Sequence, residues 1–320
     1  MRNKFPMSGR IFLADPTLLL IFHALFMAGT LWVVARGVQR GLERASLIMM
    51  PLLFLVLLIL VVYAAVSTGA YFGKASHFLF DPNFHLITGR VIINAMGHAF
   101  FTLAIGVGAM LIYGSYVPKQ ISIGWSVVIT AGLDVLVALL SGLAIFPIIF
   151  EHHLAPTAGP GLMFMVLPIA FAKMPDGQWV GALFFLLLLF AAWTSSINIA
   201  EPLVAALWEK TNLKRGHCAT IVAVAAWLLG LLSVFSFNVW AHDKIWGFTP
   251  FDLITDAVTN VILPIGGIFY ALFAGWAMRK EYSKAELALK RDWIYWCWRF
   301  ATRYIAPIGI LVVFIGAFAK

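Results

Sequence analysis

Residues 100–116, FFTLAIGVGAMLIYGSY, are apolar enough to lie in a lipid bilayer, yet their centre contains residues that weaken a helix. Thr102, Gly106 and Gly108 fall within seven positions. A glycine costs a helix about 1 kcal/mol relative to alanine, and backbone carbonyls freed in lipid must face protein or a wet cavity. The stretch therefore predicts a membrane helix that is interrupted in its middle, at a ligand-binding site.

A second apolar stretch, residues 190–202 (FAAWTSSINIAEP), contains three consecutive hydroxyl side chains, an amide and a carboxylate. Hydroxyl residues often serve only to pack membrane helices together, but three in a row are hard to place on one packing face. Hydroxyl and carbonyl oxygens are hard ligands of the kind that a sodium ion accepts. Thr194, Ser195 and Ser196 are therefore candidate sodium ligands.

The composition identifies an all-α polytopic membrane protein. Of the 320 residues, 62% are hydrophobic and 11% are charged, and the mean hydropathy is +0.94. A helix needs about 20 residues to cross the hydrocarbon of a bilayer. Eight stretches qualify, at residues 17–36, 47–66, 92–113, 124–150, 180–208, 218–240, 257–278 and 301–319. The apolar residues 161–172 are flanked by prolines and predict an extracellular re-entrant hairpin.

Lysine and arginine concentrate on one side of the predicted topology. If the odd-numbered connections face the cytoplasm, that side holds fourteen of the 22 basic residues, in agreement with the positive-inside rule. The net charge of +8 then reflects topology and contact with the lipid bilayer, and not binding of nucleic acid. We expect a multi-pass protein of the plasma (inner) membrane. Residues 290–300, KRDWIYWCWRF, are expected to form an aromatic belt at the membrane interface.

Two connections are longer than the others. Residues 67–90 include FDPNFH and are expected to be rich in turns. Residues 281–295 are expected to form a surface helix that Ser283 caps, with Glu286 three residues later completing a capping box. No internal repeat and no second globular domain is evident, so residues 1–320 are expected to form a single transmembrane domain.

Acidic residues within the predicted spans need an explanation. An aspartate at the centre of a span costs about 2.5–3.5 kcal/mol on insertion scales, so Asp134 should face a cation, a proton path or a wet cavity. Glu201 precedes Pro202, which frees a backbone carbonyl; a structural and a functional role for this carboxylate are both open. Asp252 and Asp256 suit the amino end of a helix.

His23 and His98 also lie within predicted spans, and an alternative interpretation makes them axial haem ligands. The remaining histidines have no metal-binding spacing, and the sequence has no GxSxG elbow, phosphate-binding loop or cysteine pair. We therefore expect no organic cofactor, no metal other than sodium and no enzyme activity.

The chain resembles the neurotransmitter:sodium symporter family in its bacterial branch. FFTLAIGVGAMLIYGSY is similar to that family's broken sixth helix, AGLDVLVALLSGLAIFP to its seventh, GPGLMFMVLPIAFAKMP to its extracellular hairpin and FFLLLLFAAWTSSINIAEP to its eighth. The resemblance covers nearly the whole chain in order. It implies a partial leucine-transporter-like inverted-repeat fold, with a midplane site formed by discontinuous helices.

The resemblance also implies site residues. One sodium ion would be bound by the Ala191 carbonyl and the hydroxyls of Thr194 and Ser195, and another by Thr102 and Asp134. The substrate, an amino acid or related amine, would contact Phe101, Thr102, Ala104, Val107, Ser195 and Ile199. Relatives often carry serine and phenylalanine in place of Ala104 and Val107, so this pocket should be roomier and less polar.

By the same resemblance, the eight spans correspond to the family's fourth to eleventh helices, with the first three missing. Residues 17–66 would end the first repeat, residues 91–278 would form the second, and residues 279–320 would contain a cytoplasmic surface helix and the last span. The leading interpretation is the carboxyl-terminal part of a sodium-dependent symporter that is not transport-competent alone. The alternative is a non-transporting membrane partner of a full-length relative. A homo-oligomer is compatible with either.

Overall fold

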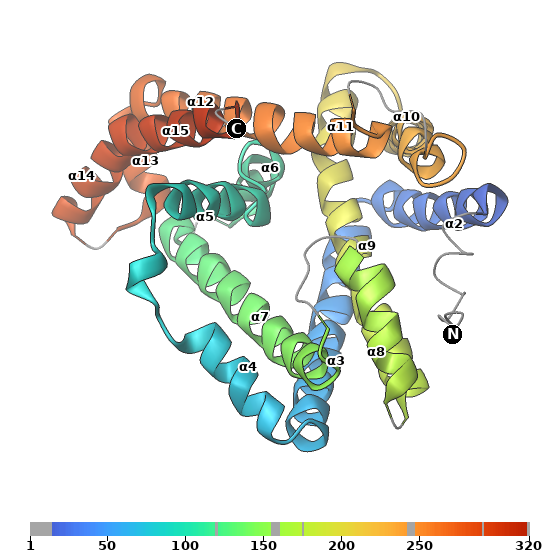
Figure 1. The fold of residues 1–320 in the computed structure, drawn as a ribbon. Helices are drawn as coiled ribbons and strands as arrows, with labels where there is room; N and C mark the ends of the chain where they lie inside the picture. Colours follow the sequence, from blue (N-terminus) through green and yellow to red (C-terminus); the bar gives the residue numbers. More distant parts are fainter. Residues whose placement is uncertain are drawn as a thin grey trace. The chain divides into compact units, whose positions relative to one another are not determined.

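The computed structural model describes residues 15–118, 121–154, 161–174, 176–241, 247–289 and 291–318, and its regular elements are helices (Figure 1). Among these residues, seven helices are long and apolar enough to cross a membrane. They are Pro16–Ala35, Gly41–Ser67, Ile123–Glu151, Gly177–Lys210, Arg215–Ser236, Pro250–Ala277 and Asp292–Gly316. They confirm seven of the eight predicted spans.

The eighth predicted span, at residues 92–113, is present as two helical pieces. α5 covers Gly89–Thr102 and α6 covers Ala109–Tyr116. Neither piece alone reaches the roughly 20 residues that cross the hydrocarbon. The all-α polytopic class is therefore confirmed, with one span interrupted.

The spanning helices carry the labels of Figure 1. They are α2 (Pro16–Ala35), α3 (Arg44–Ser67), α7 (Ile123–Glu151), α9 (Gly177–Lys210) and α10 (Arg215–Ser236). The helix Pro250–Ala277 comprises α11 (Pro250–Ala257), η4 (Val258–Ile262), α12 (Leu263–Leu272) and η5 (Phe273–Ala277). The last comprises α14 (Asp292–Phe300), η6 (Ala301–Ile305) and α15 (Ala306–Phe318). Shorter helices are η1 (Val38–Glu43), α4 (Ala70–Phe80), η2 (Phe84–Leu86), η3 (Leu162–Val166), α8 (Leu167–Lys173) and α13 (Lys280–Leu287).

The chain divides into two compact units, residues 1–81 with 137–251 and residues 82–136 with 252–320. In the first unit, α2 packs on α9 and α10, and α9 also contacts α3 and α8 (Figure 1). Its core lies between α3, the end of α7, α8 and the start of α9, where Leu57, Ile149 and Leu167 are almost fully buried. In the second unit, α15 lies against α5 and α12.

Local sequence explains where several helices begin and pack. Pro16 stands at the start of α2, and the Asp15 carboxylate accepts hydrogen bonds from the N–H groups of Thr17 and Leu18 at 2.9 and 3.1 Å. This is the preferred way to satisfy the free donors of a helix start. A Cβ at Gly177 would lie 1.7 Å from the carbonyl oxygen of Phe171, so only glycine allows α8 to turn back onto α9.

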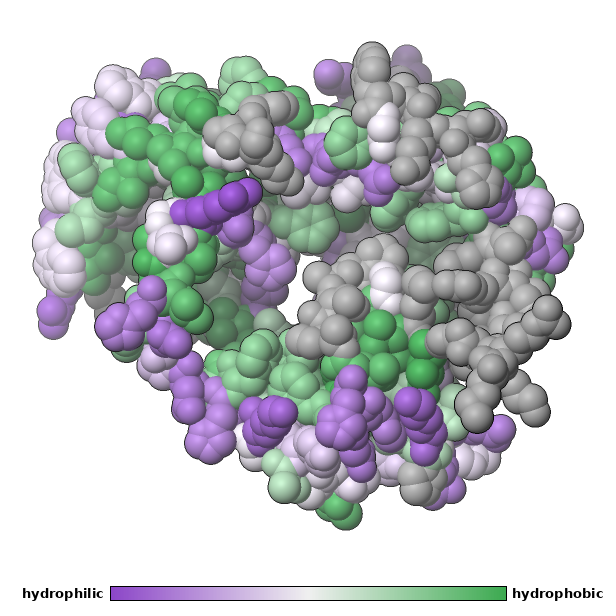
Figure 2. Space-filling model, viewed as in Figure 1, coloured by the Kyte–Doolittle hydropathy of each residue, from purple (hydrophilic) through white to green (hydrophobic). Residues whose placement is uncertain are grey.

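Apolar side chains cover much of the molecular surface (Figure 2). Leu25, Val66 and Phe269 are 63%, 80% and 68% exposed. A soluble protein would bury such residues, whereas a lipid environment solvates them. The surface thus agrees with the seven membrane-spanning helices.

Three details differ from the sequence predictions. The connection of residues 67–90 contains an 11-residue helix, α4, before its turns. A surface helix, α13, does form in the connection predicted at residues 281–295. Ser283 lies within this helix and is 2% exposed, so it is not the cap. Its hydroxyl is instead hydrogen-bonded to that of Tyr295 at 2.8 Å. The aromatic residues 292–300 belong to the last spanning helix, which begins at Asp292 and not at residue 301.

The predicted hairpin is described in part. Residues 155–160 and 175, which include its flanking prolines, lie outside the described residues. The described part is one short helical run, Leu162–Lys173, which packs on α9.

Candidate functional site

The interruption between α5 and α6 is the most distinctive local feature of the second unit. Three residues there have positive φ angles: Ala104 at 50°, Gly106 at 99° and Gly108 at 90°. Gly108 occupies the cap position of α6. The break predicted from Thr102, Gly106 and Gly108 is confirmed. The N–H groups of Leu103, Ala104, Ile105 and Val107 donate to carbonyl oxygens of the same segment or of the last turns of α5. Because the last carbonyls of a helix lack intrahelical partners, backbone oxygens are what this segment can offer a ligand.

Gly106 lies directly against the backbone of α12. A Cβ on Gly106 would stand 2.4 Å from the carbonyl oxygen of Leu263 and 3.0 Å from the amide nitrogen of Gly267. A Cβ on Gly266 would in turn stand 2.5 Å from the carbonyl oxygen of Gly106. The absence of a side chain at Gly106 and Gly266 lets the unwound segment pack directly against α12. A larger residue at either position would push the two segments apart.

The predicted ligands on this segment are accessible. Phe101 is 54% exposed, and Thr102 is exposed at the last turn of α5. The Thr102 hydroxyl donates to the carbonyl oxygen of Ala99 at 3.4 Å. Ala104 and Val107 are half-buried within the unwound stretch. The structure therefore gathers Phe101, Thr102, Ala104 and Val107 on one short, irregular segment.

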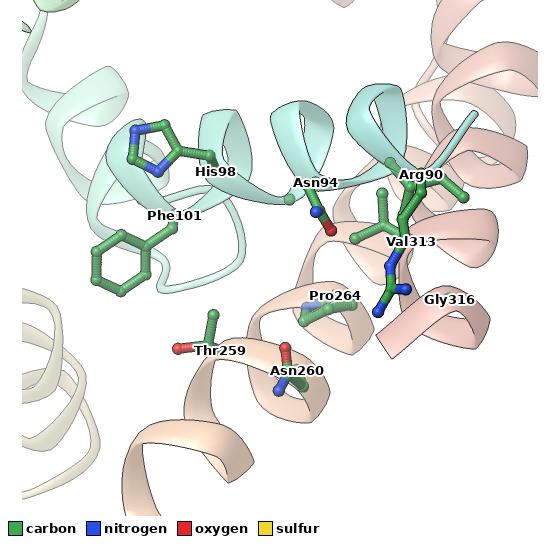
Figure 3. A pocket seen from close by; sticks show the side chains of 11 residues that line it. Arg90, Asn94, His98, Phe101, Thr259, Asn260, Pro264, Val313 and Gly316 are labelled. Atoms are coloured by element: carbon green, nitrogen blue, oxygen red, sulfur yellow. The ribbon is translucent and has the colours of Figure 1, made fainter. Parts of the chain in front are cut away.

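Phe101 also lines a cavity of about 710 Å³ within the second unit (Figure 3). Arg90, Asn94 and His98 lie one turn apart along α5, and Thr259 and Asn260 of η4 lie across from them. The remaining lining residues are Ile93, Gly97, Pro264, Val313 and Gly316. The sequence prediction missed Arg90, Asn94, Thr259 and Asn260. The spacing i, i+4, i+8 of Arg90, Asn94 and His98 was the available signal, because such residues share one helix face.

Asp134 lies in α7, within the second unit, and is partly buried. It makes no hydrogen bond or ion pair with another described residue. Its role as a sodium ligand together with Thr102 stays a prediction. The carboxylate has no described partner that would compete with a sodium ion.

The other predicted sodium ligands lie in the first unit, on α9. The hydroxyls of Thr194 and Ser195 both donate to the carbonyl oxygen of Ala191, at 3.0 and 2.9 Å. Bonds to the preceding turn are ordinary for serine and threonine in membrane helices. They also bring three oxygen atoms to one place. Thr194 is buried and Ser195 is exposed, so this cluster reaches the surface of the unit.

Ile199 and Ser196 line a different cavity of the first unit, of about 280 Å³, between α2, α9 and α10. The hydroxyls of Ser196 and Thr30 are 3.1 Å apart there. The third hydroxyl of the Thr194–Ser196 run therefore has a packing partner. Ile199 itself is 48% exposed.

The two histidines of the haem alternative lie in different units. Nε2 of His23 is 3.1 Å from the carbonyl oxygen of Trp227, and the two rings stack with centroids 6.2 Å apart. His98 lines the cavity of the second unit. Among the described residues, no group of three or more His, Cys, Asp or Glu side chains could hold a metal ion.

The model of the sodium:neurotransmitter symporter family matches residues 17–320. A protein of Bacillus subtilis (strain 168) named uncharacterized sodium-dependent transporter YhdH is 36% identical over 94% of this chain and 67% of its own length. An uncharacterized sodium-dependent transporter of Haemophilus influenzae is 32% identical over 94% of this chain and 66% of its own. The chain thus spans about two thirds of the length of these relatives.

The fold is similar to that of MhsT, solved as a crystal structure in complex with L-phenylalanine. The TM-score is 0.86 at 39% sequence identity, and the match covers 97% of this chain and 70% of MhsT. A sodium-dependent nutrient amino acid transporter 1 of Drosophila persimilis is 27% identical over 88% of this chain and 44% of its own length.

Proposed function

Because the chain belongs to the sodium:neurotransmitter symporter family, we propose that it takes part in sodium-driven symport of an amino acid or a related amine. The family consists of membrane transporters and not of enzymes. The observation that carries the proposal is the unwound stretch between Thr102 and Ala109, inside a span that is otherwise helical. Irregular backbone at membrane depth is tolerated where it lines a cavity or binds a ligand.

The chemistry of the predicted ligands fits a sodium ion. Thr102 and the carbonyls near the break offer neutral oxygen ligands, and Asp134 offers an anionic one. On α9, the Ala191 carbonyl and the Thr194 and Ser195 hydroxyls form a second set of oxygens. The residue-by-residue roles, including substrate contacts by Phe101, Ala104, Val107 and Ile199, stay proposals.

The substrate class rests on the relatives. MhsT is described in complex with L-phenylalanine, and the Drosophila relative is named for nutrient amino acids. Ala104 and Val107 are smaller than the serine and phenylalanine that relatives often carry at these positions. A substrate pocket beside them would therefore suit a bulky apolar amino acid. We therefore expect aromatic or branched amino acids to be taken up before small ones.

The proposed match of these spans to the family's fourth to eleventh helices leads to a direct experiment. Residues 1–320 are reconstituted into proteoliposomes alone, and separately as a fusion with the part of MhsT that this chain does not match. Radiolabelled phenylalanine uptake is then compared under an inward sodium gradient and an equal potassium gradient. We expect uptake above background only for the fusion, and only with sodium.

Uptake by the fusion that is equal in potassium would contradict sodium coupling. Strong sodium-driven uptake by residues 1–320 alone would contradict the prediction that this part is not competent by itself. Background uptake by both proteins, together with co-purification of residues 1–320 with a full-length relative, would favour the non-transporting partner.

A further inference from the structure

A group of basic residues gathers where the last two spanning helices meet the short helix α13. The described residues between Trp276 and Arg303 include six basic side chains and three acidic ones. The basic residues are Arg279, Lys280, Lys284, Arg291, Arg299 and Arg303, and the acidic residues are Glu281, Glu286 and Asp292. We call the basic residues the basic end. Only one ion pair forms among these described residues, Lys284 with Asp292 at 2.8 Å.

Arg299 is the least expected member of the basic end. It is only 6% exposed, yet its described partners are neutral. It donates to the Tyr295 hydroxyl at 2.8 Å and to the Met278 carbonyl at 3.4 Å, and its ε N–H is buried without a partner. Burying a cation without a counter-charge is costly. An anion beside this site would offset that cost.

Arg303 lies one turn further along the last helix and repeats the pattern. Its guanidinium lies over the ring of Trp276, 4.1 Å from the centroid, and its ε N–H is also buried and unpartnered. A Cβ on Gly275 would stand 2.9 Å from the Arg303 Cα, so the backbones of the two spanning helices touch here. The close contact fixes Arg303 and Trp276 in place before any ligand binds.

The surroundings are those of a membrane interface. Trp276, Trp293 and Trp296 are 53%, 60% and 54% exposed, and Lys280 lies over the Trp296 ring at 4.6 Å. Tryptophan is enriched at the level of lipid headgroups. Further along the same helix, Ile305 and Ile308 are 59% and 60% exposed and would contact acyl chains. The last spanning helix thus presents basic and aromatic residues at the level of a lipid headgroup and apolar residues at the level of its acyl chains.

We propose that the basic end binds the phosphate group of an anionic phospholipid. The exposed side chains of Arg279 and Lys280 contact the headgroup, with Arg303 on its inner side. Arg299 is hydrogen-bonded to the Tyr295 hydroxyl, which is in turn hydrogen-bonded to that of Ser283, and its buried positive charge adds electrostatic attraction for the phosphate. Basic pockets at span ends are suited to acidic lipid headgroups. This role is independent of transport and does not rest on the proposed substrate.

Native mass spectrometry of the purified 320-residue chain tests the proposal. The protein is exchanged into micelles with equal amounts of phosphatidylglycerol and phosphatidylcholine, and bound lipids are counted. We expect preferential retention of phosphatidylglycerol, reduced at least about fivefold in the double variant Arg279→Gln, Lys280→Gln. Both residues are exposed, so the variant should fold. Lys74→Gln removes a cation that also lies over an aromatic ring, Phe150, but outside the basic end, and should change nothing.

A further arm separates a lipid from a free anion. Inorganic phosphate at millimolar concentration should not displace phosphatidylglycerol, because it lacks the acyl chains. Unchanged lipid retention in the double variant, equal retention of phosphatidylcholine, or full displacement by inorganic phosphate would each overturn the proposal.

Discussion

The carboxylate of Glu201, in the last third of α9, is paired with the guanidinium of Arg215 at the start of α10. The Glu201 side chain is fully buried, and that of Arg215 is 16% exposed. Arg215 also donates to the carbonyl oxygen of Val34, at the end of α2, from two of its nitrogens at 3.3 Å. One guanidinium therefore joins three helices of the first unit. The structure favours the structural role for Glu201 that the sequence left open.

Removing one partner of this pair should destabilise the protein strongly. Glu201→Ala leaves a cation among packed helices, and loss of one partner of a buried pair costs about 3–5 kcal/mol. Thermal unfolding in detergent, followed by size-exclusion chromatography after heating, measures the change. Asp292→Ala is the matched control, because it breaks an exposed pair whose side chains are 54% and 73% exposed. That variant should cost at most about 1 kcal/mol. Equal melting temperatures for the two variants would contradict this account.

Gly106→Ala should disrupt the second unit. The new methyl group would meet the Leu263 carbonyl oxygen at 2.4 Å, and the backbone has a φ of 99° that alanine rarely adopts. We expect a clear fall in folded yield and in melting temperature. Gly132→Ala, in α7, meets nothing within 4 Å and should leave both unchanged. Similar behaviour of the two variants would show that the unwound segment is not held by this contact.

Ser195→Ala should weaken sodium binding without loss of stability. Its hydroxyl is exposed and donates only to the preceding turn, so little packing is lost. Sodium dependence of uptake by the fusion protein should shift to at least about tenfold higher concentration, which corresponds to about 1.4 kcal/mol. Ser76→Ala, which removes the same kind of bond to Phe72, is the control. An unchanged sodium dependence would remove Ser195 from the ligand set.

The end of α7 provides a prediction for pH. Burial is the largest cause that lowers the pKa of His152, Glu151 raises it, and Lys173 and His153 lower it further. The unfolded chain then takes up a proton at a pH near 6.5, where the folded protein does not. Stability should therefore be fully present above that pH and fall on acidification towards pH 5.

His152→Gln should flatten this pH dependence of the melting temperature between pH 5 and pH 7.5. His85→Gln replaces an exposed histidine in η2 and should leave the dependence as in the unchanged protein. A steeper pH dependence of the melting temperature in His152→Gln would contradict a lowered pKa of His152 in the folded protein.

Local patterns predicted the features that depend on local chemistry. Runs of apolar residues indicated the spans because each helix must satisfy its own backbone in lipid. The break at Thr102, Gly106 and Gly108 could be predicted because glycine weakens a helix wherever it stands. Helix α4 was missed because the following FDPNFH turn dominated the interpretation of that connection.

Contacts between segments distant in the sequence could not be predicted from local patterns. Ser283 fits a capping box by sequence, but the hydroxyl of Tyr295, on another helix, offers it a buried partner. The pairing of Glu201 with Arg215 depends on how α9 and α10 pack. The cavity beside Phe101 needs α5, η4 and α15 together, and no single stretch of sequence encodes it.

The central claim is that the unwound segment after Thr102 serves sodium-coupled amino acid symport. Phenylalanine uptake by the fusion protein, measured with and without a sodium gradient and compared with Thr102→Ala in the same fusion, tests it most directly. We predict uptake that requires sodium and that falls at least about tenfold in Thr102→Ala at limiting sodium. Uptake that is equal in sodium and potassium, or unaffected by Thr102→Ala, would contradict the claim.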